Sequence, residues 1–144
     1  MSSTGRVNAA MLSHGTLEST DLHATRRFYE EVLGLTVHQY VPVSIHIDTG
    51  DGYMYAAVHA PNATKAMPIH YRNTLLFGTR EEIDRAHLAL ETVATEYGVQ
   101  EITELASSGD RYFFRLRDLD GNWWELAYDV HGGYHGIGDV GADR

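Results

Sequence analysis

Three side chains that lie far apart in the sequence have the chemistry to hold one divalent metal ion. His14, His70 and Glu125 occupy equivalent places in two halves of the chain that repeat a similar order of elements. Two imidazoles and one carboxylate on rigid strands leave coordination positions open for substrate, water or dioxygen. The residue types therefore indicate an enzyme, provided that the strands that carry them converge.

Two amphipathic helices give the halves their similarity. The first is expected over residues 20–33, where apolar side chains recur at helical spacing before Gly34 ends the helix. The second is expected to begin at Thr79, which forms a capping box with Glu82, and to end at Gly98. Both segments have the start and stop signals of real helices.

Strand candidates surround each helix. One precedes each helix, over residues 11–18 and 69–78, and a short β-prone segment follows each. Each half ends with an aromatic strand entered through an Asp-Gly turn, at residues 51–52 and 120–121. The order strand, helix, three strands thus occurs twice, which favours a duplicated unit over a chance likeness of two α+β halves.

These elements predict a single domain that occupies all 144 residues. Its parts are a first module at about residues 10–60, a proline-containing linker at 61–68, a second module at about 69–129, and a flexible Gly- and His-rich tail at 130–144.

Composition narrows the class of protein. The net charge of −9, from 20 acids and 11 bases, disfavours nucleic-acid binding, which needs clustered Lys and Arg. No apolar run approaches the ~18 residues of a membrane span, and the start lacks a signal-peptide pattern. With no cysteine there are no disulfides or thiolate ligands, so a cytoplasmic protein is expected.

Two sequence segments carry a resemblance to a known family. In SHGTLESTDLHATRRFYEEVLGL, residues 13–35, a strand His is followed by Asp-Leu, Phe-Tyr and a helix-ending Gly. In RLRDLDGNWWELAYD, residues 115–129, Asp-x-Asp-Gly-Asn leads into a strand that bears a Glu. Both resemble the vicinal oxygen chelate superfamily, which includes glyoxalase I, extradiol dioxygenases, fosfomycin resistance proteins and bleomycin-binding proteins. Over residues 10–129 the resemblance implies an α+β, glyoxalase/dioxygenase-like fold of two βαβββ modules, which form a partly open eight-stranded barrel-like sheet.

The resemblance also implies metal ligands. It assigns His14 and Glu125 to the ligands on the first and last strands. The family's middle ligand aligns nearer Arg72 than His70, but alternate residues share one face of a strand, so a ligand displaced by two positions still fits. We take His70 as the middle ligand and Fe(II) as the metal, with Mn(II) as the alternative. Removal of His14 or Glu125 is then expected to abolish metal binding and leave the fold mostly intact.

Glu125 has the strongest sequence evidence. A carboxylate between Trp123, Trp124 and Leu126 is costly to bury without a cation or strong hydrogen bonds. Alternation places Glu125 and Trp123 on one face and Trp124 on the other, without deciding which face is inside. The resemblance predicts that Glu125 points into the barrel and that Trp124 lies under a helix.

The remaining candidates favour a small aromatic substrate. The expected substrate-binding residues are Tyr40, Tyr53, Tyr55, Arg72 and Trp123. The expected catalytic residues are His46, Tyr112, Tyr128, His131 and His135, the last two in a tail that can close as a lid. His38 is a further second-sphere candidate. Ordinary core and hairpin packing is the alternative for most of these aromatic residues.

Glyoxalase-type and fosfomycin-type enzymes of this superfamily require particular side chains in their sites. A glyoxalase-type site uses a fourth, acidic ligand, whereas the strand at residues 53–58 contains no acid. Fosfomycin-type enzymes need cations for a phosphonate; Arg72, Arg111, Arg115 and Arg117 are available, although alternation over residues 111–117 is also typical of a solvated face.

The leading interpretation is an extradiol-type ring-cleaving dioxygenase that acts on a catecholic or phenolic substrate with O2, as a homodimer. One alternative is a metal-free binding protein for an aromatic natural product or drug. Another is a metal-dependent isomerase or transferase of the same fold.

Overall fold

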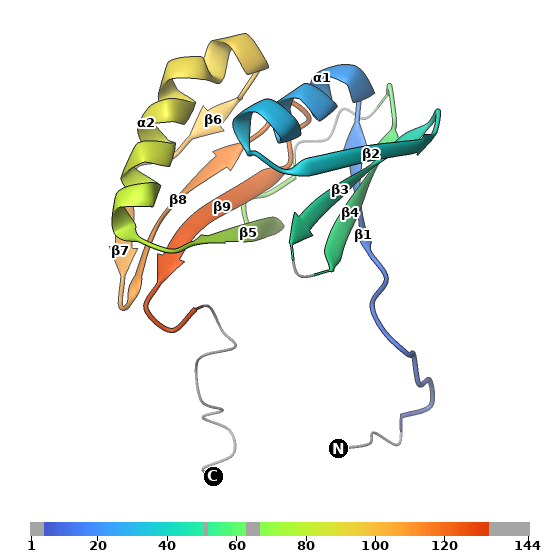
Figure 1. The fold of residues 1–144 in the computed structure, drawn as a ribbon, viewed down its shortest axis with the longest axis horizontal. Helices are drawn as coiled ribbons and strands as arrows, with labels where there is room; N and C mark the ends of the chain where they lie inside the picture. The colour runs from blue at the N-terminus through green and yellow to red at the C-terminus, as the bar shows by residue number, and fades with distance from the viewer. Residues whose placement is uncertain (1–4, 51, 63–66, 133–144) are drawn as a thin grey trace. The chain divides into compact units, whose positions relative to one another are not determined.

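The computed structural model describes residues 5–50, 52–62 and 67–132 (Figure 1). The chain divides into two compact units, Met1–Pro61 and Asn62–Arg144. None of the helices in the described ranges is long and apolar enough to cross a membrane.

The first unit is a four-stranded sheet with one helical segment packed on it. Its elements are β1 (Gly15–Ser19), α1 (Leu22–Arg27), the π-helical turn η1 (Phe28–Val32), β2 (Thr36–Val41), β3 (Ser44–Gly50) and β4 (Tyr53–His59). The strand order is β1-β4-β3-β2, with β1 parallel to β4 and the other pairs antiparallel.

Local signals explain where the first helix begins and ends. The Asp21 carboxylate accepts hydrogen bonds from the backbone amides of His23 and Ala24. Gly34, at φ +70°, follows the last turn. Phe28 and Tyr29 are fully buried, and the Ser19 and Thr25 hydroxyls lie 2.6 Å apart, which ties β1 to α1. The predicted helix is confirmed, whereas its π-helical end was not foreseen.

Gly15 is needed because β1 and β4 meet closely. It pairs with Tyr55, and a Cβ at residue 15 would lie 2.2 Å from a Tyr55 ring carbon. We expect Gly15→Ala to lower the free energy of unfolding by about 1–3 kcal/mol, since the ring must shift to admit the methyl group. Urea denaturation measures this, with the exposed Thr16→Ala as control. If Gly15→Ala matches the control, the ring moves aside freely.

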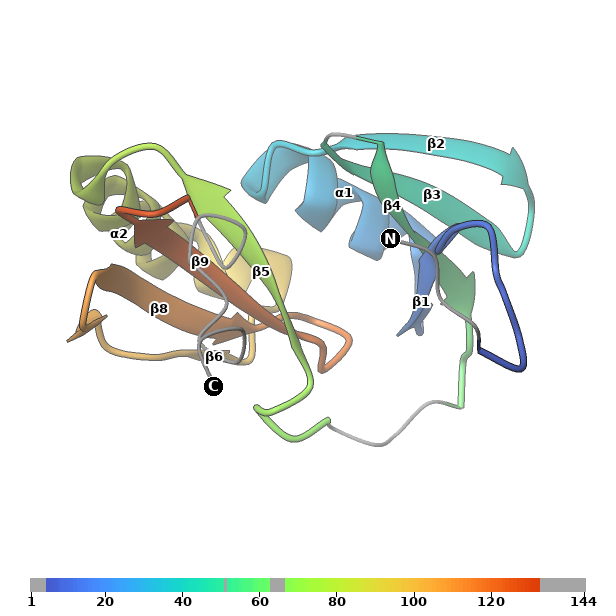
Figure 2. The ribbon, with the colours of Figure 1, turned by 90° about the horizontal axis from the view of Figure 1, so that it is seen from below.

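The second unit repeats the arrangement with one additional short strand. Its elements are β5 (Arg72–Phe77), α2 (Arg80–Tyr97), β6 (Glu101–Ile102), β7 (Ala106–Ser108), β8 (Arg111–Arg117) and β9 (Trp123–Asp129). The order is β5-β9-β8-β6, and β7 pairs with β8. Figure 2 shows β5, β9 and β8 side by side. The predicted α+β class and the two strand–helix–strand units are confirmed.

Helix α2 covers one face of the second sheet. Half of its predicted capping box is present, because the Thr79 hydroxyl accepts from the Glu82 backbone amide. The Glu82 carboxylate accepts from the Thr79 hydroxyl, where the box would have it accept from the Thr79 backbone amide. Gly98 ends the helix at φ +72°. The buried His87 ring packs edge-on against Phe114 at 4.8 Å between centroids. Phe114 pairs with Leu126 and shares its face, so Glu125 points to the face opposite α2.

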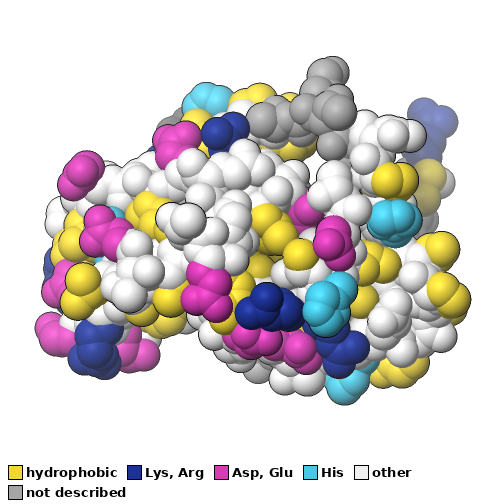
Figure 3. Space-filling model, turned by 90° about the horizontal axis from the view of Figure 1, so that it is seen from above, with side chains coloured by type: hydrophobic (Ala, Val, Ile, Leu, Met, Phe, Trp, Pro, Cys, Tyr) yellow, Lys and Arg dark blue, Asp and Glu magenta, His cyan; other side chains and the backbone are white. Residues whose placement is uncertain are grey.

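The surface carries charges of both signs. Acidic side chains lie among basic and histidine side chains on the face drawn in Figure 3.

Candidate functional site

The Glu125 carboxylate is a buried charge of the second unit that lies among arginine side chains. It is 1% exposed. Its Oε1 accepts hydrogen bonds from Arg111 Nη2 at 2.5 Å and Thr74 Oγ1 at 3.2 Å. Its Oε2 accepts from Arg115 Nε at 2.8 Å and lies 3.3 Å from Arg72 Nε. Three guanidinium groups thus surround one carboxylate.

Strand register brings these side chains together. In the antiparallel β8–β9 pair, Arg115 stands opposite Glu125. In the parallel β5–β9 pair, Thr74 stands opposite Glu125, and Arg72 is two residues away on the same face. Arg111 also lies 3.5 Å from the Asp129 carboxylate, so it joins two acids.

The arginines keep Glu125 ionised. Burial raises the pKa of this carboxyl, but the hydrogen bonds from Arg111 and Arg115 and their positive charges outweigh it, and the net result is a lowered pKa. The ionised form accepts all of these donors, as a buried carboxylate must.

The arginines also pack on aromatic rings of the same face. The guanidinium carbons of Arg111 and Arg115 lie 5.4 and 4.8 Å from the Phe113 centroid. That of Arg117 lies 5.8 Å from the Trp123 ring. We call this surface the arginine face: Arg72, Arg111, Phe113, Arg115, Arg117 and Trp123, around Glu125.

Asp118 fixes the hairpin that sets the register of β8 and β9. It is fully buried, and its Oδ1 accepts from the backbone amides of Asp120 and Asn122 at 2.9 and 3.0 Å. Its Oδ2 accepts from Trp124 Nε1 at 3.1 Å. Burial raises the pKa of Asp118 to about 6. Sequence reasoning missed this role, although Asp-x-Asp-Gly-Asn is a recognisable turn signal.

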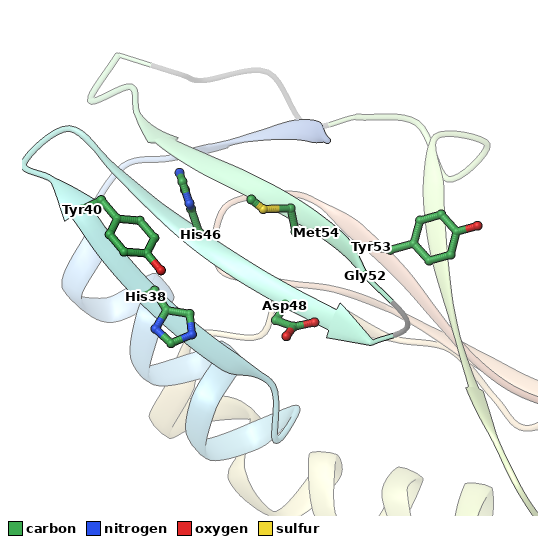
Figure 4. Close-up of a pocket in the computed structure, with 7 residues that line it drawn as sticks. All are labelled: His38, Tyr40, His46, Asp48, Gly52, Tyr53 and Met54. Atoms are coloured by element: carbon green, nitrogen blue, oxygen red, sulfur yellow. The ribbon is translucent and has the colours of Figure 1, made fainter. Parts of the chain in front are cut away.

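A pocket of about 230 Å³ lies in the first unit (Figure 4). Its lining residues are His38, Tyr40, His46, Asp48, Gly52, Tyr53 and Met54, from β2, β3, β4 and the turn between the last two. The Tyr40 ring lies 5.9 Å from His38 and 5.1 Å from His46 between centroids. Tyr53 points away from these three rings. His38 stands opposite His46 in the β2–β3 pair.

Comparison with protein families decides the identity of the fold. The family model of the Glyoxalase/Bleomycin resistance protein/Dioxygenase superfamily matches residues 12–126. The chain belongs to this superfamily. The resemblance to vicinal oxygen chelate proteins that the sequence motifs indicated is confirmed.

Solved structures of the superfamily share the fold. A glyoxalase/bleomycin resistance protein/dioxygenase from Nocardioides is 20% identical, with a TM-score of 0.66 and 88% of each chain covered. Lactoylglutathione lyase from Agrobacterium tumefaciens is 17% identical, with a TM-score of 0.65 and coverage of 88% and 98%. A fosfomycin resistance protein from Listeria monocytogenes, complexed with Mn(II) and sulfate, is 17% identical, with a TM-score of 0.68 and coverage of 85% and 93%. The comparison with curated proteins gives no match.

Superfamily members include proteins that bind divalent metals, so the fit of Glu125 to such an ion matters. A cation at this carboxylate would approach three positive charges within 3.3 Å of its oxygens. Guanidinium groups have no lone pair for a metal. Within the described part of the chain, no group of three His, Asp or Glu is arranged to hold a metal ion. The donor set around Glu125, as folded here, does not fit a divalent cation.

The two histidines of the predicted metal triad lie outside regular strands. His14 is exposed just before β1, with its Nδ1 2.9 Å from Ser13 Oγ. His70 is exposed in a turn, because β5 begins only at Arg72. His14 belongs to the first unit, and His70 belongs to the second with Glu125. Their role as metal ligands stays a prediction.

Other predicted site residues fall into separate places. Tyr40, His46 and Tyr53 line the pocket, whereas Arg72 and Trp123 belong to the arginine face. Tyr112 and Tyr128 lie on the face of the second sheet that α2 covers. Tyr55 lies beside Gly15 in the first unit. The His131 ring lies 2.8 Å from the Asp110 carboxylate. His135 lies outside the described residues.

The contacts of Tyr112 affect its acidity. Its hydroxyl donates to Asp84 of α2, and this hydrogen bond, with a smaller effect of burial, raises the pKa of the phenol. It therefore stays protonated at neutral pH.

Proposed function

We propose that this superfamily member binds a small planar aromatic molecule in the pocket of its first unit, and that Glu125 holds no metal ion. The single observation that carries the proposal is that Arg72, Arg111 and Arg115 already neutralise this carboxylate. In a metal site the cation would do this, and here guanidinium groups provide the positive charge. The proposal corresponds to the metal-free alternative drawn from the sequence.

The pocket of the first unit supports an aromatic ligand. Its volume of about 230 Å³ suits a molecule of one or two rings. The rings of Tyr40, His38 and His46 offer edges and faces to a planar partner, and Asp48 offers an acceptor for a hydroxyl group.

Binding of 2,3-dihydroxynaphthalene, a planar diol, tests the pocket by titration calorimetry. We expect Tyr40→Ala to weaken binding about tenfold, the effect of losing ~1.4 kcal/mol of ring contact. Tyr71→Ala is the matched control, because Tyr71 is also exposed but lies outside the pocket. The dissociation constant should be the same with and without EDTA. Equal binding by wild type and Tyr40→Ala would contradict the assignment of the pocket.

The second candidate is the extradiol-type dioxygenase that uses Fe(II) or Mn(II), a catecholic substrate and O2. The position of Glu125 on the face opposite α2 and the Mn(II) in the solved fosfomycin resistance protein support a metal site in general. The catecholic substrate and O2 come from the sequence-based interpretation alone. His14, His70 and Glu125 would hold the ion. In that case Glu125 must exchange its arginine partners for the metal.

Elemental analysis after anaerobic purification with added Fe(II) separates the two candidates. The metal-free proposal expects far less than one ion per chain. A stoichiometric ion that is lost in His14→Ala, together with oxygen uptake and a yellow ring-cleavage product from catechol, would establish the dioxygenase instead. A stoichiometric ion without oxygen uptake would point to a metal-dependent isomerase or transferase.

Superfamily membership also leads us to propose a homodimer. Light scattering on the purified protein measures the mass, with about twice 16.1 kDa expected.

A further inference from the structure

We propose that the arginine face of the second unit binds an aromatic carboxylate. It uses residues of a different unit from the pocket, so it stands or fails separately from the aromatic pocket in the proposed function.

The first reason is charge. The side chains of Arg72, Arg111, Arg115 and Arg117 are about three-quarters buried. Their acidic partners are Glu125, Asp129 and Glu101. The Glu101 side chain is half exposed, and its carboxylate lies 3.9 Å from Arg117. Four positive charges thus meet three negative ones, although the whole chain carries −9. Repulsion among partly buried cations is relieved by one further anion.

The second reason is unused donors. Arg115 contacts Glu125 through Nε, and no described residue accepts a hydrogen bond from its two terminal nitrogens. Arg117 Nε is buried and also lacks a hydrogen-bond partner among the described residues. Arg117 Nε is covered by protein atoms, whereas the Arg115 side chain is 24% exposed, so the terminal nitrogens of Arg115 are the donors that an arriving acceptor meets. The planar fork of a guanidinium group matches the two oxygens of a carboxylate.

The third reason is the apolar surface between the cations. Phe113 is half-buried and lies under both Arg111 and Arg115. A flat ring beside the carboxylate can lie against Phe113 and against the faces of the guanidinium groups. Inorganic phosphate or acetate would meet only the charges. The combination of charge, donors and ring favours an aromatic acid over a simple anion.

Benzoate is the probe, followed by titration calorimetry and by thermal unfolding at constant ionic strength. We expect saturable binding that raises the midpoint of unfolding. Acetate and inorganic phosphate should bind about tenfold more weakly, because they lack the ring.

Variants locate the site. Arg115→Gln is expected to weaken benzoate binding at least about tenfold, whereas Arg85→Gln, on the exposed side of α2, should have no effect. Arg115→Lys keeps the charge but loses the planar fork, so it should also weaken binding and it serves if Arg115→Gln does not fold. Circular dichroism verifies the fold of each variant.

Two results would overturn the proposal. One is that benzoate shows no saturable binding at constant ionic strength. The other is that Arg115→Lys and Arg85→Gln change the dissociation constant of benzoate equally. Phosphate that binds as tightly as benzoate would refute the aromatic class. Tyr40→Ala should leave benzoate binding unchanged, so a failure of this site is distinguishable from a failure of the pocket.

Discussion

Glu125→Gln is expected to lower the free energy of unfolding by about 3–5 kcal/mol, the typical cost of removing one partner from a buried ion pair. The amide would leave Arg72, Arg111 and Arg115 crowded without their shared negative charge. Equilibrium denaturation in urea, followed by circular dichroism, measures the change. This result differs from the sequence-based expectation that loss of Glu125 spares the fold.

Glu101→Gln is the matched control. Glu101 also pairs with an arginine, Arg117, but at 3.9 Å and with its side chain 52% exposed. We expect a change within about 0.5 kcal/mol, as for other exposed ion pairs. If Glu125→Gln behaves like this control, the arginines do not depend on Glu125, and the main support for metal-free binding is lost.

Stability should also respond to the ionisation of Asp118. Its pKa is about 6 in the folded protein, against an ordinary 3.8. The folded state therefore holds the proton more tightly than the unfolded state. This contribution to stability is complete below pH 3.8 and is lost as the pH rises through about 6. The loss is ~3 kcal/mol for a shift of ~2 pKa units.

Asp118→Asn isolates this effect, because asparagine does not titrate. Its amide oxygen can still accept from the backbone, but its amino group faces Trp124 Nε1, which adds a pH-independent cost. The stability of wild type minus variant should fall between pH 4 and pH 7. Glu125 acts in the opposite direction, since its lowered pKa gives stability that is lost as the pH falls, but it is present in both proteins and cancels. Parallel pH profiles would contradict the assignment.

The sequence predicted the elements that depend on neighbouring residues. The Thr79 cap of α2 and the glycine exits at Gly34 and Gly98 are local signals, and the structure has them. The alternation around Glu125 was also correct, because Trp124 lies on the face that α2 covers. Local chemistry was sufficient for these features.

The arginine environment of Glu125 was not predictable in the same way. Its partners come from β5 and β8, and the pairing of Thr74 with Glu125 joins residues far apart in the sequence. Arg111 and Arg115 were visible as an alternating pattern, which is equally typical of a solvated strand face. Only the register between strands distinguishes the two cases, and a shift of one residue would have turned these side chains to the other face.

The ion pairs of three arginines with one carboxylate limit which substitutions around Glu125 could create a metal site. A histidine that replaced Arg72 alone would offer a ligand while two guanidinium groups still repelled an incoming ion. Loss of Glu125 alone would leave all three arginines without their shared negative partner. A metal centre at Glu125 therefore requires several substitutions together, because each single one leaves a buried charge without its partner or a cation facing the ion.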